Sequence, residues 1–191
     1  MLTKTTELDA INIMLSTIGE SPINSIASIS GFADANIAKQ ILDETAVSVQ
    51  EHGWHFNTEI HFVMTPTFPA MEILIPANCI EIDAEDTAVD VAMRGDRLYD
   101  KINHTYKFEK PLACRLVVLL EFEQTPQAAR HYITIRAARV FQQRVVGSQL
   151  LGAFTEKDEM RALVALKRFE SKTADYNMLT GNYSVMRTLD R

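Results

Sequence analysis

Residues 125–147 read TPQAARHYITIRAARVFQQRVVG, and this stretch decides what the rest of the chain has to surround. Thr125 suits the position that caps a helix, Pro126 suits the first helical turn, and Gly147 suits the far end. At about 3.6 residues per turn, the apolar side chains cover nearly the whole circumference, which is typical of a buried helix. Four arginines interrupt them: Arg130, Arg136, Arg139 and Arg144.

Arginines in a buried helix need carboxylate or carbonyl partners. One interpretation is the central helix of a bundle, whose arginines reach the surface along their aliphatic stems. The other is a helix enclosed partly by its own chain and partly by a neighbouring subunit. In the second interpretation Arg136, Arg139 and Arg144 lie at the subunit interface.

Composition indicates an ordinary soluble globular protein. The chain has 191 residues, 47% hydrophobic and 23% charged, enough for one or two compact domains. No apolar run approaches the roughly 18 residues of a membrane-spanning helix, and the polar N-terminus does not resemble a signal peptide. Cys79 and Cys114 stand apart without a CxxC motif or a paired histidine, which indicates reduced thiols. We expect neither a metal ion nor another cofactor.

The net charge of −6 is distributed unevenly. Residues 1–100 hold 4 Lys and Arg against 16 Asp and Glu, whereas residues 101–191 hold 15 against 9. A basic half can bind nucleic acid, but these cations are interspersed with acids such as Glu156 and Glu170. We therefore favour complementarity between the two halves, within one chain or between copies.

Three further helices are predicted from apolar residues that recur at the spacing of one helical face. Thr6 and Asp9 form a weaker relative of the capping box at the start of the first helix. The predicted spans are 6–18, 33–51 and 155–180 at most. With the central helix they form an antiparallel bundle of about four helices, built from residues 1–53 and 124–180.

Between the helical parts, residues 54–123 change from the helical period to the strand period of two. Alternation in 56–64 predicts a half-buried strand, and 115–123 is the strongest strand. The turn at 94–97 predicts a hairpin, with Gly95 available for positive φ. Shorter strands are predicted at 71–75, 79–83, 89–93, 98–101 and 106–108. The predicted fold class is therefore α+β: a helical bundle with a small, mainly antiparallel β insertion.

The borders of these parts carry two further signals. Trp54 follows Gly53, which ends a helix, and precedes the first strand, so we expect Trp54 to wedge between the helical and β parts. Residues 177–191 have no clear period but hold more apolar side chains than a disordered tail usually does. We expect another surface to cover this C-terminal tail, of which 181–191 lies beyond the bundle.

Motifs that would indicate catalysis are missing: the sequence has no GxSxG, P-loop, GxGxxG or HExxH. His52 and His55 have no accompanying ligand cluster and are interpreted as ordinary histidines. Glu121 and Glu123 would share one strand face roughly 7 Å apart, which is compatible with a glycosidase pair. Glutamates at this spacing are also common near strand ends, so hydrolysis is an alternative rather than the preferred reading.

Several motifs extend over nearly the whole chain. In order they are ELDAINIMLSTIGESP (7–22), DANIA (34–38), GWHFNTE (53–59), LYD (98–100), EQTP (123–126) and DYNML (175–179). Together they resemble the tail tubular protein A family, the head-to-tail adaptors of short-tailed bacteriophages. The motifs at 7–22 and 53–59 are the specific ones.

The resemblance implies a non-enzymatic structural protein of the virion tail, assembled in the host cytoplasm. It implies a ring of twelve copies between the portal protein and the tail nozzle protein, lining the channel through which DNA leaves, without sequence-specific DNA binding or a membrane anchor. The unlike charges of the two halves would supply the two surfaces that such a ring needs. Tail residues would dock on the portal: Tyr183, Val185, Met186 and Leu189. A glycan hydrolase using Glu121 and Glu123 and a DNA-binding regulator are the alternatives.

Overall fold

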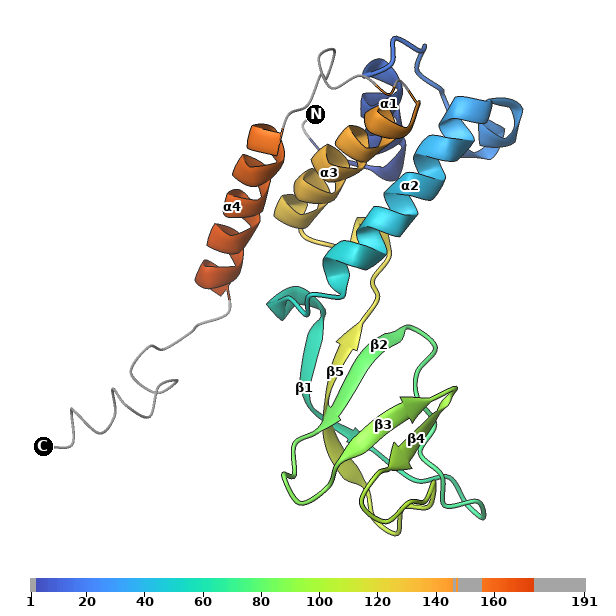
Figure 1. Cartoon of the computed structure of the whole chain (residues 1–191), viewed down its shortest axis with the longest axis vertical. Coiled ribbons are helices and arrows are strands. Elements are labelled where there is room, and N and C mark those ends of the chain that lie inside the picture. Colours follow the sequence, from blue (N-terminus) through green and yellow to red (C-terminus); the bar gives the residue numbers. More distant parts are fainter. Residues whose placement is uncertain (1–2, 146, 148–155, 174–191) are drawn as a thin grey trace, which may run out of the picture.

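The computed structural model describes residues 3–145, 147 and 156–173. A helical part lies at one end and a β part at the other (Figure 1). The helices are α1 (Glu7–Ser16), α2 (Ala33–Gln50), α3 (Gln127–Val145) and α4 (Glu156–Thr173), with the short 3-10 helices η1 (Ile26–Gly31), η2 (His55–Asn57) and η3 (Phe122–Gln124). The predicted α+β class is confirmed, whereas residue 155, the end of the predicted fourth helix (174–180) and the C-terminal tail lie outside the described residues.

Helix α3 is the centre of the helical part, as its all-round apolar surface predicted. It packs between α2 and α4, and α1 packs on both α2 and α3 (Figure 1). Its buried residues include Ala129, Ile133, Ala137 and Phe141. Among the described helices, none combines the length and the hydropathy that a bilayer crossing requires.

Arg130 shows how a charged side chain is accommodated in this core. It is buried, and its guanidinium donates to three carbonyl oxygens: those of Thr5 at 2.8 Å, Thr125 at 2.9 Å and Glu123. These carbonyls replace the water that the cation loses. Arg130 therefore ties the start of α3 to the chain before α1.

The first helix begins at the predicted cap. The N–H of Asp9 donates to Thr6 Oγ1 at 3.1 Å, and the N–H of Thr6 donates to Asp9 Oδ2 at 2.9 Å. These reciprocal bonds complete a capping box. Hydrogen bonds from Thr6 hold the pKa of the Asp9 carboxyl below its usual value.

The β part contains a three-stranded antiparallel sheet and a hairpin. Its strands are β1 (Thr58–Met64), β2 (Cys79–Ala84), β3 (Val91–Arg94), β4 (Arg97–Asp100) and β5 (Leu112–Val118). The sheet order is β1-β5-β2, and β3 pairs with β4 through the predicted turn, where Gly95 has a φ of +68°. Its core, which includes Ile73, Leu98 and Leu116, is separate from the helical core.

The predicted half-buried strand at 56–64 is wrong in its start and its burial. Residues 55–57 form η2, and within β1 only Met64 is buried, whereas Ile60 is 65% and Val63 62% exposed. β1 is an edge strand with a bulge between Glu59 and Phe62. Sequence alternation cannot reveal that a strand lies at the edge of a sheet and carries a bulge, with consecutive residues exposed.

The other corrections concern strand ends. β5 stops at Val118 instead of continuing to 123. Residues 71–75 and 106–108 form isolated bridges, Glu72 with Lys107 and Leu74 with Arg97, rather than strands. Their apolar residues are nevertheless partly buried, which is why periodicity suggested strands there.

Candidate functional site

The helical and β parts meet where α2 leads into β1 and where β5 leads into α3 (Figure 1). Two amides occupy this joint: Gln50 is 0% and Asn57 1% exposed. Gln50 Nε2 donates to the carbonyl of Leu120 at 3.0 Å, and Gln50 Oε1 accepts from the N–H of Leu120 at 2.8 Å. Asn57 Nδ2 donates to the carbonyls of Gln50 and Val118, each at 3.0 Å. The two amides thus link the connection between α2 and β1 to the connection between β5 and α3.

Trp54 is buried, as expected, but it belongs to the helical core. Its Nε1–H donates to the carbonyl of Val49 at 2.6 Å, and its ring lies against His52 with centroids 4.6 Å apart. The backbone N–H of Trp54 donates to Asn57 Oδ1 at 2.9 Å. Trp54 therefore closes the end of the helical core, and Gln50 and Asn57 form the wedge that we expected Trp54 to form.

Gly53 makes the tight connection at this joint possible. Its φ is +68°, and a Cβ there would lie 3.2 Å from Val117 Cγ2 and 3.4 Å from the Arg115 guanidinium. Any other residue would be strained in this backbone conformation and would crowd β5. The motif GWHFNTE (53–59) contains Asn57 but not Gln50, and the burial of both amides depends on Leu120 and Val118, which are distant in sequence.

The three arginines predicted at a subunit interface have acidic partners in their own chain. Arg139 Nε lies 2.5 Å from Glu159 Oε2, and Arg136 Nε lies 3.9 Å from Glu159 Oε1. Arg144 pairs with Glu44 at 3.0 Å, and its side chain is 56% exposed. Arg136 and Arg139 therefore hold α4 on α3, whereas Arg144 lies where a neighbouring molecule could reach it.

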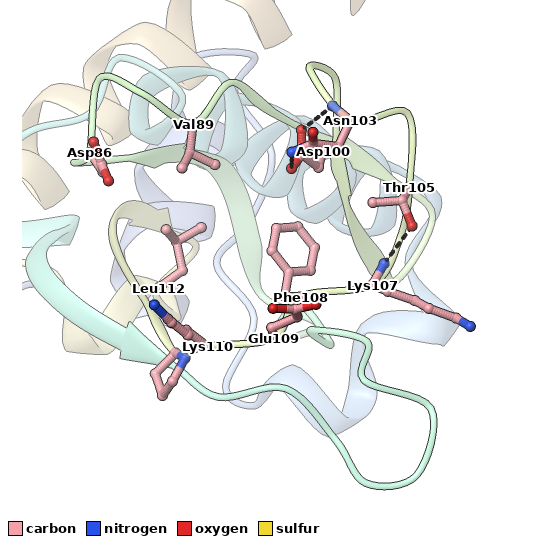
Figure 2. Close-up of a pocket in the computed structure, with 11 residues that line it drawn as sticks. Asp86, Val89, Asp100, Asn103, Thr105, Lys107, Phe108, Glu109, Lys110 and Leu112 are labelled. Atoms are coloured by element: carbon pink, nitrogen blue, oxygen red, sulfur yellow. Dashed lines mark hydrogen bonds between the residues drawn. The ribbon is translucent and has the colours of Figure 1, made fainter.

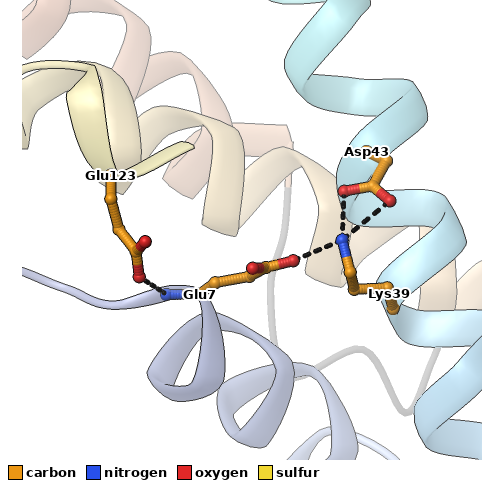
Figure 3. Close-up of polar contacts among 4 residues, drawn as sticks. All are labelled: Glu7, Lys39, Asp43 and Glu123. Carbon is orange, nitrogen blue, oxygen red and sulfur yellow. Dashed lines mark hydrogen bonds and ion pairs between the residues drawn. The ribbon is translucent and has the colours of Figure 1, made fainter. Parts of the chain in front are cut away.

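Glu121 and Glu123 do not share a strand face, because β5 ends before them. Glu121 precedes η3 and Glu123 lies within it. Glu123 Oε1 accepts from the N–H of Glu7 at 3.3 Å, and the Glu7 carboxylate pairs with Lys39 (Figure 3). The strand geometry that suggested a glycosidase pair was wrong, and Glu123 instead holds the start of α1.

A hollow of about 660 Å³ opens in the β part (Figure 2). Asp100 lies on its wall, where its Oδ1 accepts from the N–H groups of Ile102 at 2.8 Å and Asn103 at 2.9 Å. Lys107 and Lys110 also line the hollow (Figure 2). Because N–H groups of its own turn already bond the Asp100 carboxylate, we assign this side chain to stabilising the turn.

The titratable groups suited to metal binding or thiol chemistry are dispersed. In the described ranges, no three His, Cys, Asp or Glu side chains gather as ligands. Cys79 and Cys114 are free thiols, as predicted. Burial raises the pKa of Cys114 to about 11, which keeps it protonated at neutral pH. The predicted docking residues Tyr183, Val185, Met186 and Leu189 lie outside the described residues.

The described residues form a helical part and a β part that are joined through the buried amides of Gln50 and Asn57, and comparison with known proteins specifies the class of protein. The chain belongs to the tail tubular protein family, which matches residues 8–176. It is 28% identical over 127 residues to tail tubular protein A of Klebsiella phage KP34. That alignment covers 66% of each chain, just under two thirds of the relative's length. The protein is therefore a structural component of a phage tail.

Proposed function

We propose that the protein is a head-to-tail adaptor that forms a ring, of twelve copies, between the portal protein and the tail nozzle protein. The observation that carries this proposal is the family match over residues 8–176. It agrees with the motifs that extend in order along the sequence. In this proposal the ring lines the channel through which DNA leaves the head.

The joint supports such a role mechanically. Gln50 and Asn57 bind both passages of the chain between two parts that have separate cores. Buried amides with satisfied donors and acceptors favour one arrangement over others. Each part can therefore contact a different component of the tail while the angle between the parts is kept.

The predicted contact residues have different roles in this proposal. Arg136 and Arg139 position α4 through Glu159, and Arg144 is exposed beside Glu44 at the bundle surface. The tail beyond the bundle, 181–191, docks on the portal through four apolar residues: Tyr183, Val185, Met186 and Leu189. In the same proposal, the β insertion, 54–123, contacts the tail nozzle protein.

The charge of the protein is compatible with a DNA channel. Each phosphate that a cation neutralises adds affinity for DNA, which would slow its passage. A net charge of −6 does not favour such binding. A DNA-binding regulator would instead show salt-dependent affinity for duplex DNA, and a measurement of that affinity distinguishes the two functions.

Native mass spectrometry of the purified protein, alone and with the portal protein, tests the proposal. We expect a closed oligomer of twelve copies in at least one of these samples, and a larger fraction of it at low than at high salt. Immunoelectron microscopy of complete particles should place the protein between head and tail. A monomer in both samples together with labelling elsewhere in the particle would contradict the adaptor function.

A further inference from the structure

The outer faces of α2 and α4 lie on opposite sides of α3 (Figure 1). Both faces expose large apolar side chains, which a solvated helix face does not need. On α4, Met160 is 60% and Val164 48% exposed, and on α2, Ile37 is 41% exposed. Phe32, the residue that precedes α2, is also exposed.

Helix α4 has an outer face on which cations outnumber acids. Two of its acids point inward: Glu159 pairs with Arg139 at 2.5 Å, and Glu170 accepts from the N–H of His55 at 2.6 Å. Glu156 is exposed, and Asp158 lies beside Arg161. Its cations are exposed around Val164: Lys157, Arg161, Lys167, Arg168 and Lys172. Among the described residues, only Arg161 of these five has an acid within ion-pair distance, Asp158 at 3.2 Å.

Helix α2 has the opposite arrangement. Its one cation, Lys39, is drawn toward α1, since it pairs with Glu7 as well as with Asp43 at 2.8 Å (Figure 3). Glu44 is exposed five residues after Lys39, where it pairs with Arg144 of its own chain at 3.0 Å and stays 47% exposed, and Glu51 is exposed directly after the helix. At 100° per residue, roughly, Glu44 and Glu51 fall on the same outward line, seven positions apart.

We propose that the outer face of α4 in one copy packs on the outer face of α2 in the next copy. Met160 and Val164 meet the apolar residues Ile37 and Phe32, and the cations around Val164 meet Glu44 and Glu51. Because the two faces are unlike and lie on opposite sides of the subunit, the contact is head-to-tail, the kind that closes into a ring. The inference rests on the proposed ring and specifies its interface.

The same cations could in principle bind DNA phosphates, but the composition of the face favours a protein. Phosphate binding uses cations alone, whereas Met160 and Val164 occupy the middle of the α4 face. A protein interface combines such an apolar centre with a charged rim. The matching acids and apolar residues of α2 supply the other half of this interface.

Charge reversal with rescue tests the contact. The α4 variant carries Lys157→Glu and Arg168→Glu, and the α2 variant carries Glu44→Lys and Glu51→Lys. Each should weaken self-association at least about tenfold, because like charges would face each other. The chain that carries all four substitutions should recover part of the association, since the reversed residues of α4 and α2 again have opposite charges. Native mass spectrometry and incorporation into phage particles are the measurements.

The matched control carries Lys107→Glu and Lys110→Glu, the same change of charge on exposed lysines of the β part. Its self-association in native mass spectrometry should equal that of the wild type, and circular dichroism checks that every variant is folded. The proposed interface is wrong, although the ring proposal survives, in either of two cases. In the first, the wild type and the α4 variant form rings equally well. In the second, the chain with all four substitutions does not regain association.

If the α4 variant loses affinity for duplex DNA but keeps its rings, the face binds DNA and this inference is wrong. If the wild type forms rings neither in solution nor in particles, the proposed function fails first.

Discussion

Gln50 is fully buried and bonds both backbone groups of Leu120, which lose these partners when the side chain is removed. Replacing Gln50 by Ala should lower the free energy of unfolding by about 1–3 kcal/mol for each group left unsatisfied. Urea denaturation measures this loss. Gln40→Ala is the control, because Gln40 is an exposed glutamine of the same helix, and its effect should stay below about 0.5 kcal/mol. Equal effects of the two substitutions would show that the joint does not depend on Gln50.

Asp100 makes the stability of the β part depend on pH. The N–H of Asn103, and then its side-chain amide, hold the pKa of the Asp100 carboxyl below its ordinary value of 3.8. A lowered pKa means that the ionised group stabilises the fold above pH 3.8 and loses this contribution as the pH falls through the lower, folded-state pKa.

Asp100→Asn should therefore destabilise the protein more at pH 7 than at about pH 3, where part of the wild-type advantage has been lost. Urea midpoints at the two pH values give the comparison. Asp96→Asn serves as the control, because the Asp96 side chain is 84% exposed in the neighbouring turn. A gap between Asp100→Asn and wild type that is the same at both pH values would contradict the role assigned to this carboxylate.

At the scale of elements, an ion-pair cluster contributes to the attachment of α4 beside the buried side chains of Ala162 and Leu166. Arg139→Glu places two like charges where Arg139 and Glu159 now lie 2.5 Å apart, and should cost about 1–3 kcal/mol. Arg144→Glu should cost less, because both members of its pair are solvated. Thermal unfolding measures both. Combining Arg139→Glu with Glu159→Arg should restore much of the lost stability, and no recovery would mean that the pair does not hold α4.

Helices were predictable from the sequence because each carries its own signals. The cap at Thr6 and the all-round apolar surface of 125–145 are local properties, and both are present in the structure. That arginines in this helix need carbonyl or carboxylate partners was predicted, but the burial of Arg130 within its own chain, on the carbonyls of Thr5 and Thr125, was not. What an individual helix packs against was not encoded locally, so the partner of Arg139 was not predicted.

Strand ends were less predictable because they depend on distant groups. The apolar run after Val118 suggested that β5 continues, but the backbone of Leu120 is bonded by the Gln50 side chain rather than by a neighbouring strand. Alternation likewise indicated β1 correctly while misjudging its burial. The joint was also only partly predictable. Gly53 and Trp54 stand out in the sequence, whereas the contacts of Gln50 and Asn57 depend on Leu120 and Val118, which are distant in sequence.

For the whole molecule, deletion of residues 177–191 separates folding from attachment. The apolar residues of this segment follow neither a helical nor a strand period, so we expect a folded subunit with nearly unchanged helical circular dichroism. Ordering a chain end costs about 1–2 kcal/mol per residue, so its apolar residues need a well-packed partner. Attachment of the truncated protein to filled heads should fail. Normal infectivity would contradict docking by the tail, and insolubility would place the tail in the subunit's own core.

The β part begins and ends at the same place, since Thr58 and Val117 are paired residues of β1 and β5. The residues between them are enclosed by the hydrogen-bonded pair β1 and β5, and none of them belongs to the helical core. Such a segment is a cassette: it can be lengthened, shortened or exchanged without moving the ends to which the bundle is attached. Lineages that keep the bundle could therefore adapt to new neighbours by replacing this cassette, and a designer could graft a foreign domain at the same two residues.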